Sequence, residues 1–118
     1  MPKTKFPSVS YGAANSIAAP TEGWADATTT TTPENIDLTA WAGSYITIEC
    51  ETDDHYVLFD TDGSTTIQAG AQATVGSGDV PRTIYSGAPN PPMVVPPGKP
   101  FLVYRAVAAT GTLRVTRS

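Results

Sequence analysis

The sequence predicts an all-β domain, most simply an antiparallel β-sandwich of the jelly-roll type, or else a small barrel. Three observations support this fold class. The chain holds 11 Pro and 10 Gly among 118 residues together with many Thr, and Pro and Gly break helices whereas Thr favours strands. Apolar and polar residues alternate over short segments, which is the period of a strand with one buried face. Turn-forming residues separate these segments at short intervals, and no helix is predicted.

The first 35 residues lack this alternation. We expect residues 1–35 to form an extended N-terminal arm and residues 36–118 to form one β-sandwich domain, since a chain of this length can bury a modest core. Pro and Gly interrupt the arm, which also contains a run of uncharged Thr. Its aromatic residues Tyr11 and Trp24 favour an arm that is ordered by contact with a partner. A disordered tail is the alternative.

The first strands of the domain lie between residues 44 and 60. Ser44 to Cys50 alternates apolar with polar residues, and His55 to Asp60 carries apolar side chains on both faces. The polar segment Glu51 to Asp54 is short enough to be a turn. We therefore expect the two strands to form a β-hairpin.

Six further short strands complete a set of about eight. Phe101–Ala108 is apolar on both faces, which predicts a central position in a sheet. In the last strand Leu113 and Val115 should face the core, which leaves Arg114 on the outer face. The six predicted segments are Thr65–Gln68, a weak edge strand at Gln72–Val75, Arg82–Tyr85, Met93–Val95, Phe101–Ala108 and Thr112–Thr116.

Charged residues are sorted along the chain. All eleven acidic residues lie between Glu22 and Asp79, and the basic residues lie at Lys3, Lys5 and from Arg82 onward. Such a chain can pair its two parts within one fold or between neighbouring copies, which favours ordered assembly. The net charge of −4 disfavours a nucleic-acid-binding protein, which would need a basic surface for phosphates.

No residue pattern predicts catalysis. His55 is the one histidine, and no nucleophile in the local pattern pairs with it, so we expect a structural residue at a strand end. The lone Cys50 lies in an apolar strand pattern and should pack as a small core residue. We expect no enzyme activity and no cofactor.

Two groups of acidic residues suggest other chemistry. The segment Asp60 to Ser64 has part of a calcium-loop pattern but lacks the third acid and the final Glu, so a β-turn is the favoured interpretation and weak calcium binding the alternative. Glu49, Glu51, Asp53 and Asp54 cluster near the predicted hairpin tip. Paired carboxylates serve glycosidases, but a solvated charged surface is favoured here.

The N-terminus, Met1 to Pro7, is basic without a following apolar segment, and no long apolar run occurs elsewhere. We therefore expect no signal peptide, no membrane span and synthesis in the cytoplasm.

The segments Ile36–Glu49, Tyr56–Phe59 and Gly111–Ser118 resemble small structural proteins of tailed bacteriophage virions. The resemblance is one of pattern, covers about half the chain, and implies no catalytic residue. It implies a virion protein, with decoration of the capsid head as the favoured role and a tail or fibre module as another. It also implies a homo-oligomer, with a trimer favoured, that contacts the major capsid protein or another virion protein.

The function we expect is therefore a capsid decoration (cement) protein. It would bind neither nucleic acid nor membranes, and would stabilise the assembled head through the β-domain and the arm. The alternative is a carbohydrate- or receptor-binding module in which Trp24, Trp41, Tyr85 and Tyr104 stack on sugars. The residues expected to contact the partner are Tyr11, Trp24, Glu51, Asp53, Asp54, Arg114 and Arg117.

Overall fold

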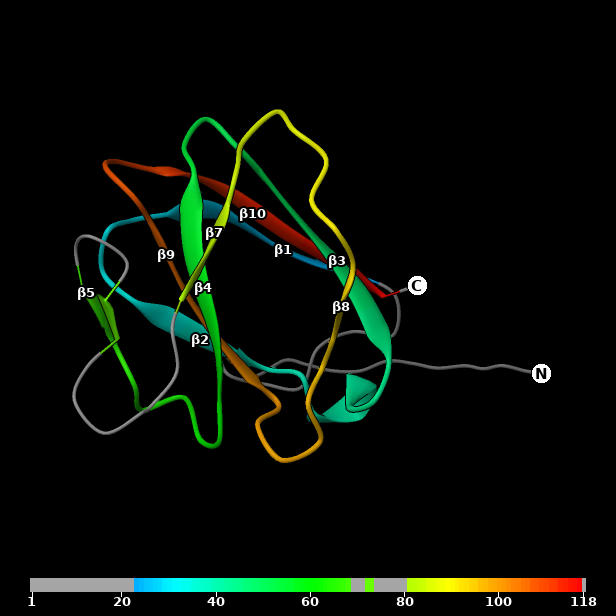
Figure 1. Ribbon diagram of the computed structural model, residues 1–118. Coiled ribbons are helices and arrows are strands. Elements are labelled where there is room, and N and C mark those ends of the chain that lie inside the picture. The colour runs from blue at the N-terminus through cyan, green and yellow to red at the C-terminus, as the bar shows by residue number, and fades with distance from the viewer. Residues whose placement is uncertain (1–22, 69–71, 74–80, 118) are drawn as a thin grey trace.

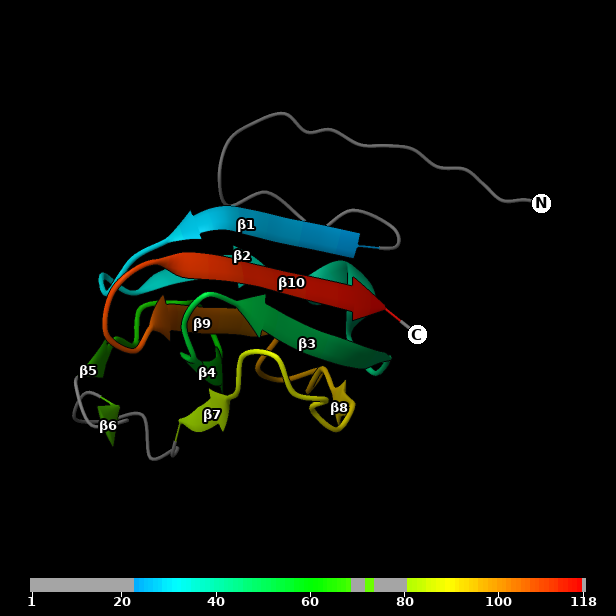
Figure 2. The ribbon, with the colours of Figure 1, turned by 90° about the horizontal axis from the view of Figure 1, so that it is seen from above.

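The computed structural model describes residues 23–68, 72–73 and 81–117, which form two packed antiparallel sheets of four strands (Figure 1, Figure 2). Sheet I has the strand order β1-β10-β3-β8, and sheet II has the order β2-β9-β4-β7. A separate two-stranded ribbon pairs β5 with β6. The strands are β1 Gly23–Thr29, β2 Glu34–Asp37, β3 Tyr45–Glu51, β4 His55–Asp60, β5 Ile67–Gln68, β6 Gln72–Ala73, β7 Arg82–Ile84, β8 Met93–Val94, β9 Phe101–Ala106 and β10 Gly111–Arg117.

The connectivity is that of a jelly roll. Numbered in chain order, the eight strands of the two sheets follow the order 1-8-3-6 in sheet I and 2-7-4-5 in sheet II. Each strand of one sheet therefore lies opposite a strand of the other sheet that directly precedes or follows it in this order. This is the arrangement of a jelly roll. The predicted fold class is confirmed, and the sheets remain two open layers instead of a closed barrel.

The predicted hairpin between Ser44–Cys50 and His55–Asp60 is wrong. β3 pairs with β10 and β8, whereas β4 pairs with β9 and β7, so residues 52–54 carry the chain from sheet I to sheet II. The burial of the two strands explains the difference. β3 is buried on one face only, while β4 is buried on both faces and needs the second cover that sheet II receives from the ribbon.

The predicted boundary of the arm at residue 35 is also wrong. β1 is paired along β10, from Gly23 opposite Thr116 to Thr29 opposite Gly111, and β2 is paired with β9. The sandwich thus begins at Gly23, and residues 1–22 of the predicted arm lie outside the described residues. β1 shows no apolar alternation because its inward residues include Asp26 and Thr29, so it is held by its sheet partner and by polar contacts.

The core fills the space between the two sheets. Inward side chains of both sheets meet there, and Trp41 closes one end of it from a single turn of 3-10 helix, η1 (Thr39–Trp41). Cys50 is buried in this core, as predicted, and its thiol donates to the carbonyl of Ile84. The buried core residues are Ile36, Leu38, Trp41, Ile46, Ile48, Cys50, Val57, Ile84, Met93, Val95, Leu102, Tyr104, Leu113 and Val115.

A second, smaller cluster lies on the outer face of sheet II. Leu58, Ile67 and Val103 pack together where the ribbon approaches β4 and β9. Arg105 is buried beside them without a carboxylate partner among the described residues. Its guanidinium donates instead to the carbonyls of Ala106, Ile67 and Val107, and it lies 5.8 Å from the centre of the Tyr56 ring. Neutral carbonyls and an aromatic face can hold a guanidinium in this way because its five donors are spread over a plane.

Candidate functional site

Four connections cross between the sheets at one end of the sandwich, at residues 30–33, 52–54, 85–92 and 107–110. The predicted acidic tip lies here. Glu51 forms an ion pair with Arg114 of the same chain, with Oε2 2.6 Å from Nη1. The hydrogen bond from Arg114 lowers the pKa of Glu51, and the same bond raises the pKa of Arg114. Both residues are exposed, but the structure brings them together within one copy.

Asp53 and Asp54 fasten neighbouring connections to each other. Asp53 Oδ2 accepts hydrogen bonds from the amides of Ala108 and Ala109 at 2.9 and 2.8 Å. Burial alone would raise the pKa of Asp53, but these amide donors hold it below its ordinary value. Asp54 Oδ1 accepts from the amide of Ser86 at 2.8 Å. Both carboxylates therefore stabilise the fold, whereas sequence reasoning predicted that they contact a partner.

His55 lies fully buried beneath these connections. Its Nδ1 donates to the carbonyl of Asp53 at 2.9 Å, and its Nε2 lies 2.6 Å from Oγ1 of Thr29. The carbonyl of Gly111 is 3.0 Å from the same Thr29 oxygen. The imidazole thus bonds to the connection at Asp53 and to Thr29 at the end of β1, and Thr29 in turn lies against Gly111 at the start of β10. These contacts agree with the structural role predicted for His55.

The other predicted contact residues are spread over the molecule. Trp24 is half-buried and packs edge-on against Tyr104, with ring centres 5.5 Å apart. The Tyr104 hydroxyl donates to Asp26 at 2.8 Å, so these contacts hold β1 against the core. Arg117 is exposed at the end of β10, and Arg114 lies on the outer face, as predicted, with Leu113 and Val115 buried. Tyr11 lies outside the described residues.

The segment Asp60 to Ser64 is folded as a turn. Asp60 accepts hydrogen bonds from the amides of Thr61 and Thr65, and Asp62 accepts from the amide and hydroxyl of Ser64. These donors bond to both carboxylate oxygens of Asp60 and to Oδ1 of Asp62, as in the β-turn that the sequence favoured. Over residues 23–68, 72–73 and 81–117, no three His, Cys, Asp or Glu side chains are grouped to hold a metal ion.

The clearest exposed surface lies elsewhere, on the outer face of sheet I. Tyr45 of β3 is 60% exposed and Val94 of β8 is 41% exposed, and the two residues are directly opposite each other in the sheet. Thr47 and Thr116 form the next outward pair on the same face, between β3 and β10. Sequence reasoning did not single out Tyr45 or Val94 as exposed apolar residues. The alternation in β3 places Tyr45 on the face of the strand away from the buried Ile46, so the sequence does indicate that Tyr45 is exposed.

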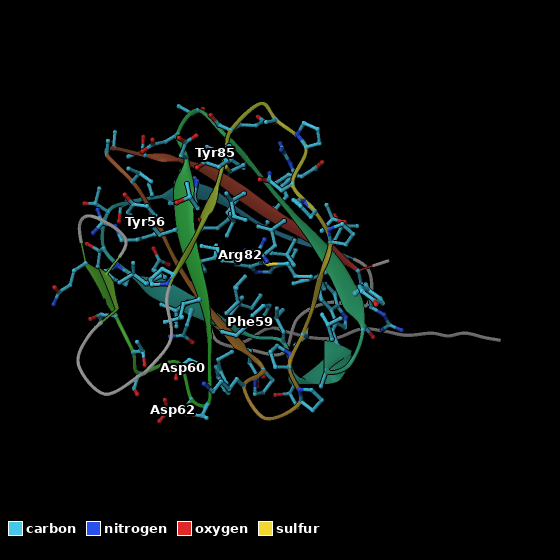
Figure 3. The ribbon with its side chains drawn as sticks, in the orientation of Figure 1. Tyr56, Phe59, Asp60, Asp62, Arg82 and Tyr85 are labelled. Carbon is cyan, nitrogen blue, oxygen red and sulfur yellow. The ribbon has the colours of Figure 1, made fainter. Side chains whose placement is uncertain are left out.

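Of the four aromatic residues considered for sugar stacking, Tyr85 alone is largely exposed, at 57% (Figure 3). Trp41 and Tyr104 are buried in the core, and Trp24 packs against Tyr104. The described part of the chain contains no helix that is both long and apolar enough to cross a membrane. Comparison of the whole chain with protein-family models, with curated proteins and with solved structures finds no match.

Proposed function

We propose that the protein is a structural component of a bacteriophage virion that binds the assembled head as a decoration protein. The jelly roll supports this proposal without deciding it, because the fold is used by viral capsid proteins and by lectins alike. The sequence resemblance to phage structural proteins points to the virion. We further propose that the protein acts as a homo-oligomer, a trimer by the same resemblance.

The observation that carries the proposal is the exposed pair Tyr45 and Val94 on sheet I. The outer face of an open sheet is accessible, and an aromatic residue beside an aliphatic one gives this face an apolar patch at its β8 edge. The short polar side chains of Thr47 and Thr116 continue this face. Such a surface can lie against a flat partner, as the outside of a capsid offers.

The mechanism is mass action. A protein that binds the assembled shell, and not its separated subunits, stabilises the shell by roughly 1–4 kcal/mol per saturated site. No bond is made or broken in this process, so the proposal needs only a folded domain and a complementary surface.

The test is binding of the purified protein to phage heads from which it has been removed. We expect the wild-type protein to co-sediment with the heads and Tyr45→Ser/Val94→Ser to lose at least tenfold in affinity while keeping its unfolding midpoint. Tyr85→Ser is the matched control, since it removes an equally exposed tyrosine from another surface. Equal binding of all three proteins, or no binding of the wild-type protein, would refute the proposal.

A second candidate function rests on Tyr85. The side-chain amide of Asn90 bonds to both the amide and the carbonyl of Tyr85, which fixes the loop beneath an exposed ring. A fixed, exposed ring can stack on a sugar. If the wild-type protein binds glycans and Tyr85→Ser abolishes that binding, the carbohydrate-binding function is preferred to decoration.

A further inference from the structure

A cleft opens between the edge strands of the two sheets, on the side of the molecule where β7 and β8 lie. β7 contains three residues and β8 contains two, so neither edge covers the sandwich along its length. β7 pairs with β4 only from His55 to Val57. The preceding residue is Pro81, which has no amide to continue the pairing. Among the described strands, residues 58–60 of β4 are therefore paired on the β9 side alone.

The cleft has an apolar floor and a basic rim. It encloses about 220 Å³ and is lined by Val57, Leu58, Phe59, Arg82, Met93, Pro96 and Lys99. Val57 and Met93 belong to the buried core, and Phe59 packs against it. Figure 3 shows Phe59 and Arg82 on the side of β4 and β7 that faces β8. A tight turn, in which the Lys99 amide donates to the carbonyl of Pro96, forms the opposite rim.

The charge of the rim follows from the sorting of charge along the chain. Among the basic residues after position 81, Arg114 is paired with Glu51, and Arg105 is buried among carbonyls. Arg82 is exposed and forms no ion pair or hydrogen bond with another described residue through its side chain. No carboxylate is among the described residues that line the cleft. An anion placed beside Arg82 would therefore meet its guanidinium and no like charge among these residues.

We propose that this cleft binds an extended segment of a partner protein in which a large apolar residue stands next to an Asp or Glu. The apolar side chain would fill the volume above Phe59 and Met93. The carboxylate would meet the guanidinium of Arg82, which can bind it through two parallel hydrogen bonds. Because residues 58–60 of β4 have no partner among the described strands on the β7 side, their backbone groups offer a place for strand addition, which is why an extended segment fits better than a helix.

This proposal goes beyond the decoration function, since the cleft is separate from the Tyr45–Val94 surface and can be tested without phage heads. The probe is a blocked Thr/Val peptide with a central Phe–Glu pair, and the matched peptide has Phe–Gln. Binding is followed by amide chemical shifts of the isotope-labelled full chain. We expect the largest shifts at Leu58, Phe59 and Arg82, and at least tenfold weaker binding of the Phe–Gln peptide.

The variants separate charge from shape. Arg82→Glu should weaken binding of the Phe–Glu peptide at least tenfold, and Arg82→Gln should do so if the Glu variant does not fold. Arg117→Glu is the matched control, because it reverses an exposed arginine outside the cleft. Unchanged binding by Arg82→Glu or Arg82→Gln, equal binding of both peptides, or shifts confined to other strands would each overturn the proposal. Self-association that Arg82→Glu abolishes would assign the cleft to a second copy instead, and would also overturn it.

Discussion

Thr29 Oγ1 lies 2.6 Å from Nε2 of His55, and this contact joins the end of β1 to the start of β4 across 26 residues of the chain. Because His55 Nδ1 donates to the carbonyl of Asp53, Nε2 of the neutral ring can only accept the single proton of the Thr29 hydroxyl, which is then not donated to the carbonyl of Gly111. The ring is fully buried, so a proton added to it places a charge away from water. The pKa of His55 is lowered mainly by this burial, and Asp53, Asp26 and Asp54 offset part of the effect.

Acid should therefore destabilise the fold through His55. A histidine whose folded pKa lies below its unfolded value near 6.5 contributes stability above that value and loses it as the pH falls toward the folded pKa. We expect the urea midpoint of the wild-type protein to be lower at pH 5.5 than at pH 7.5. Glu51, Asp53, Asp60 and Asp62 do not interfere in this pH range, since their pKa values are lowered from 4.5 or 3.8.

His55→Gln supplies the control for this prediction. It should be less stable than the wild-type protein at pH 7.5 but show a smaller change between the two pH values. Burial and the nearby Asp26 raise the pKa of Glu34, so this group stabilises the protein as the pH falls, opposite to His55. The wild-type protein and the His55→Gln variant are therefore also compared in a Glu34→Gln background. A wild-type midpoint that rises at pH 5.5 would mean that a cationic ring, donating to Thr29 while Thr29 donates to Gly111, is the better bonded form.

The ion pair of Glu51 and Arg114 predicts a local effect on titration. Arg114→Gln removes the hydrogen bond that lowers the pKa of Glu51, so that pKa should rise toward 4.5. Arg117→Gln is the control and should leave it unchanged. The chemical shift of the Glu51 carboxyl carbon, followed by NMR through an acid titration, gives the pKa of Glu51 in each variant. Because the pair is exposed, we expect neither variant to change the urea midpoint appreciably. Equal pKa values of Glu51 in the two variants would contradict the pairing.

The sequence predicted the strands better than their partners. All eight predicted segments contain a strand, because alternation reports which face of a strand is buried. The hairpin failed because alternation does not say which sheet a strand joins. The short polar turn at residues 52–54 is compatible with both a hairpin and a crossover. The burial of both faces of β4 was visible in Leu58 and Val57, and it indicates a central strand with a second cover.

The candidate contact residues were less predictable. Glu51, Asp53 and Asp54 appeared as a solvated cluster because carboxylates at a turn are usually exposed. In the structure they bind groups that are far away in the sequence, such as Arg114, Ala108 and Ser86. No local pattern reveals such partners. For the same reason the sequence did not predict β1, whose backbone pairs with β10 at the other end of the chain.

Truncation tests the corrected start of the domain. A chain that begins at Gly23 contains every described strand, so we expect it to unfold cooperatively. A chain that begins at Asn35 lacks β1, the Thr29 contact to His55 and the packing of Trp24 on Tyr104. An aromatic pair contributes about 0.5–1.5 kcal/mol beyond the area it buries, and the pairing of β1 with β10 is lost as well, against a total stability of about 5–15 kcal/mol for most domains. We therefore expect the shorter chain to be unfolded by circular dichroism, and a folded one would restore the original boundary at residue 35.

Gly111, the first residue of β10, lies close against residues 51–55. A Cβ at this position would lie 2.6 Å from the carbonyl oxygen of Glu51, 3.0 Å from Cε1 of His55 and 3.2 Å from the amide nitrogen of Asp53. Two of these neighbours are backbone atoms, and the third is the ring that joins the connections, so none can move freely. Gly111→Ala should thus destabilise the protein by about 1–3 kcal/mol, the usual cost of overpacking. Gly98→Ala is the matched control, because a Cβ there meets no atom within 4 Å, and it should leave the urea midpoint unchanged or slightly raised. If both variants unfold at the same urea concentration as the wild-type protein, the close approach of residues 51–55 to Gly111 does not hold in solution, and the role of His55 in joining the connections fails with it.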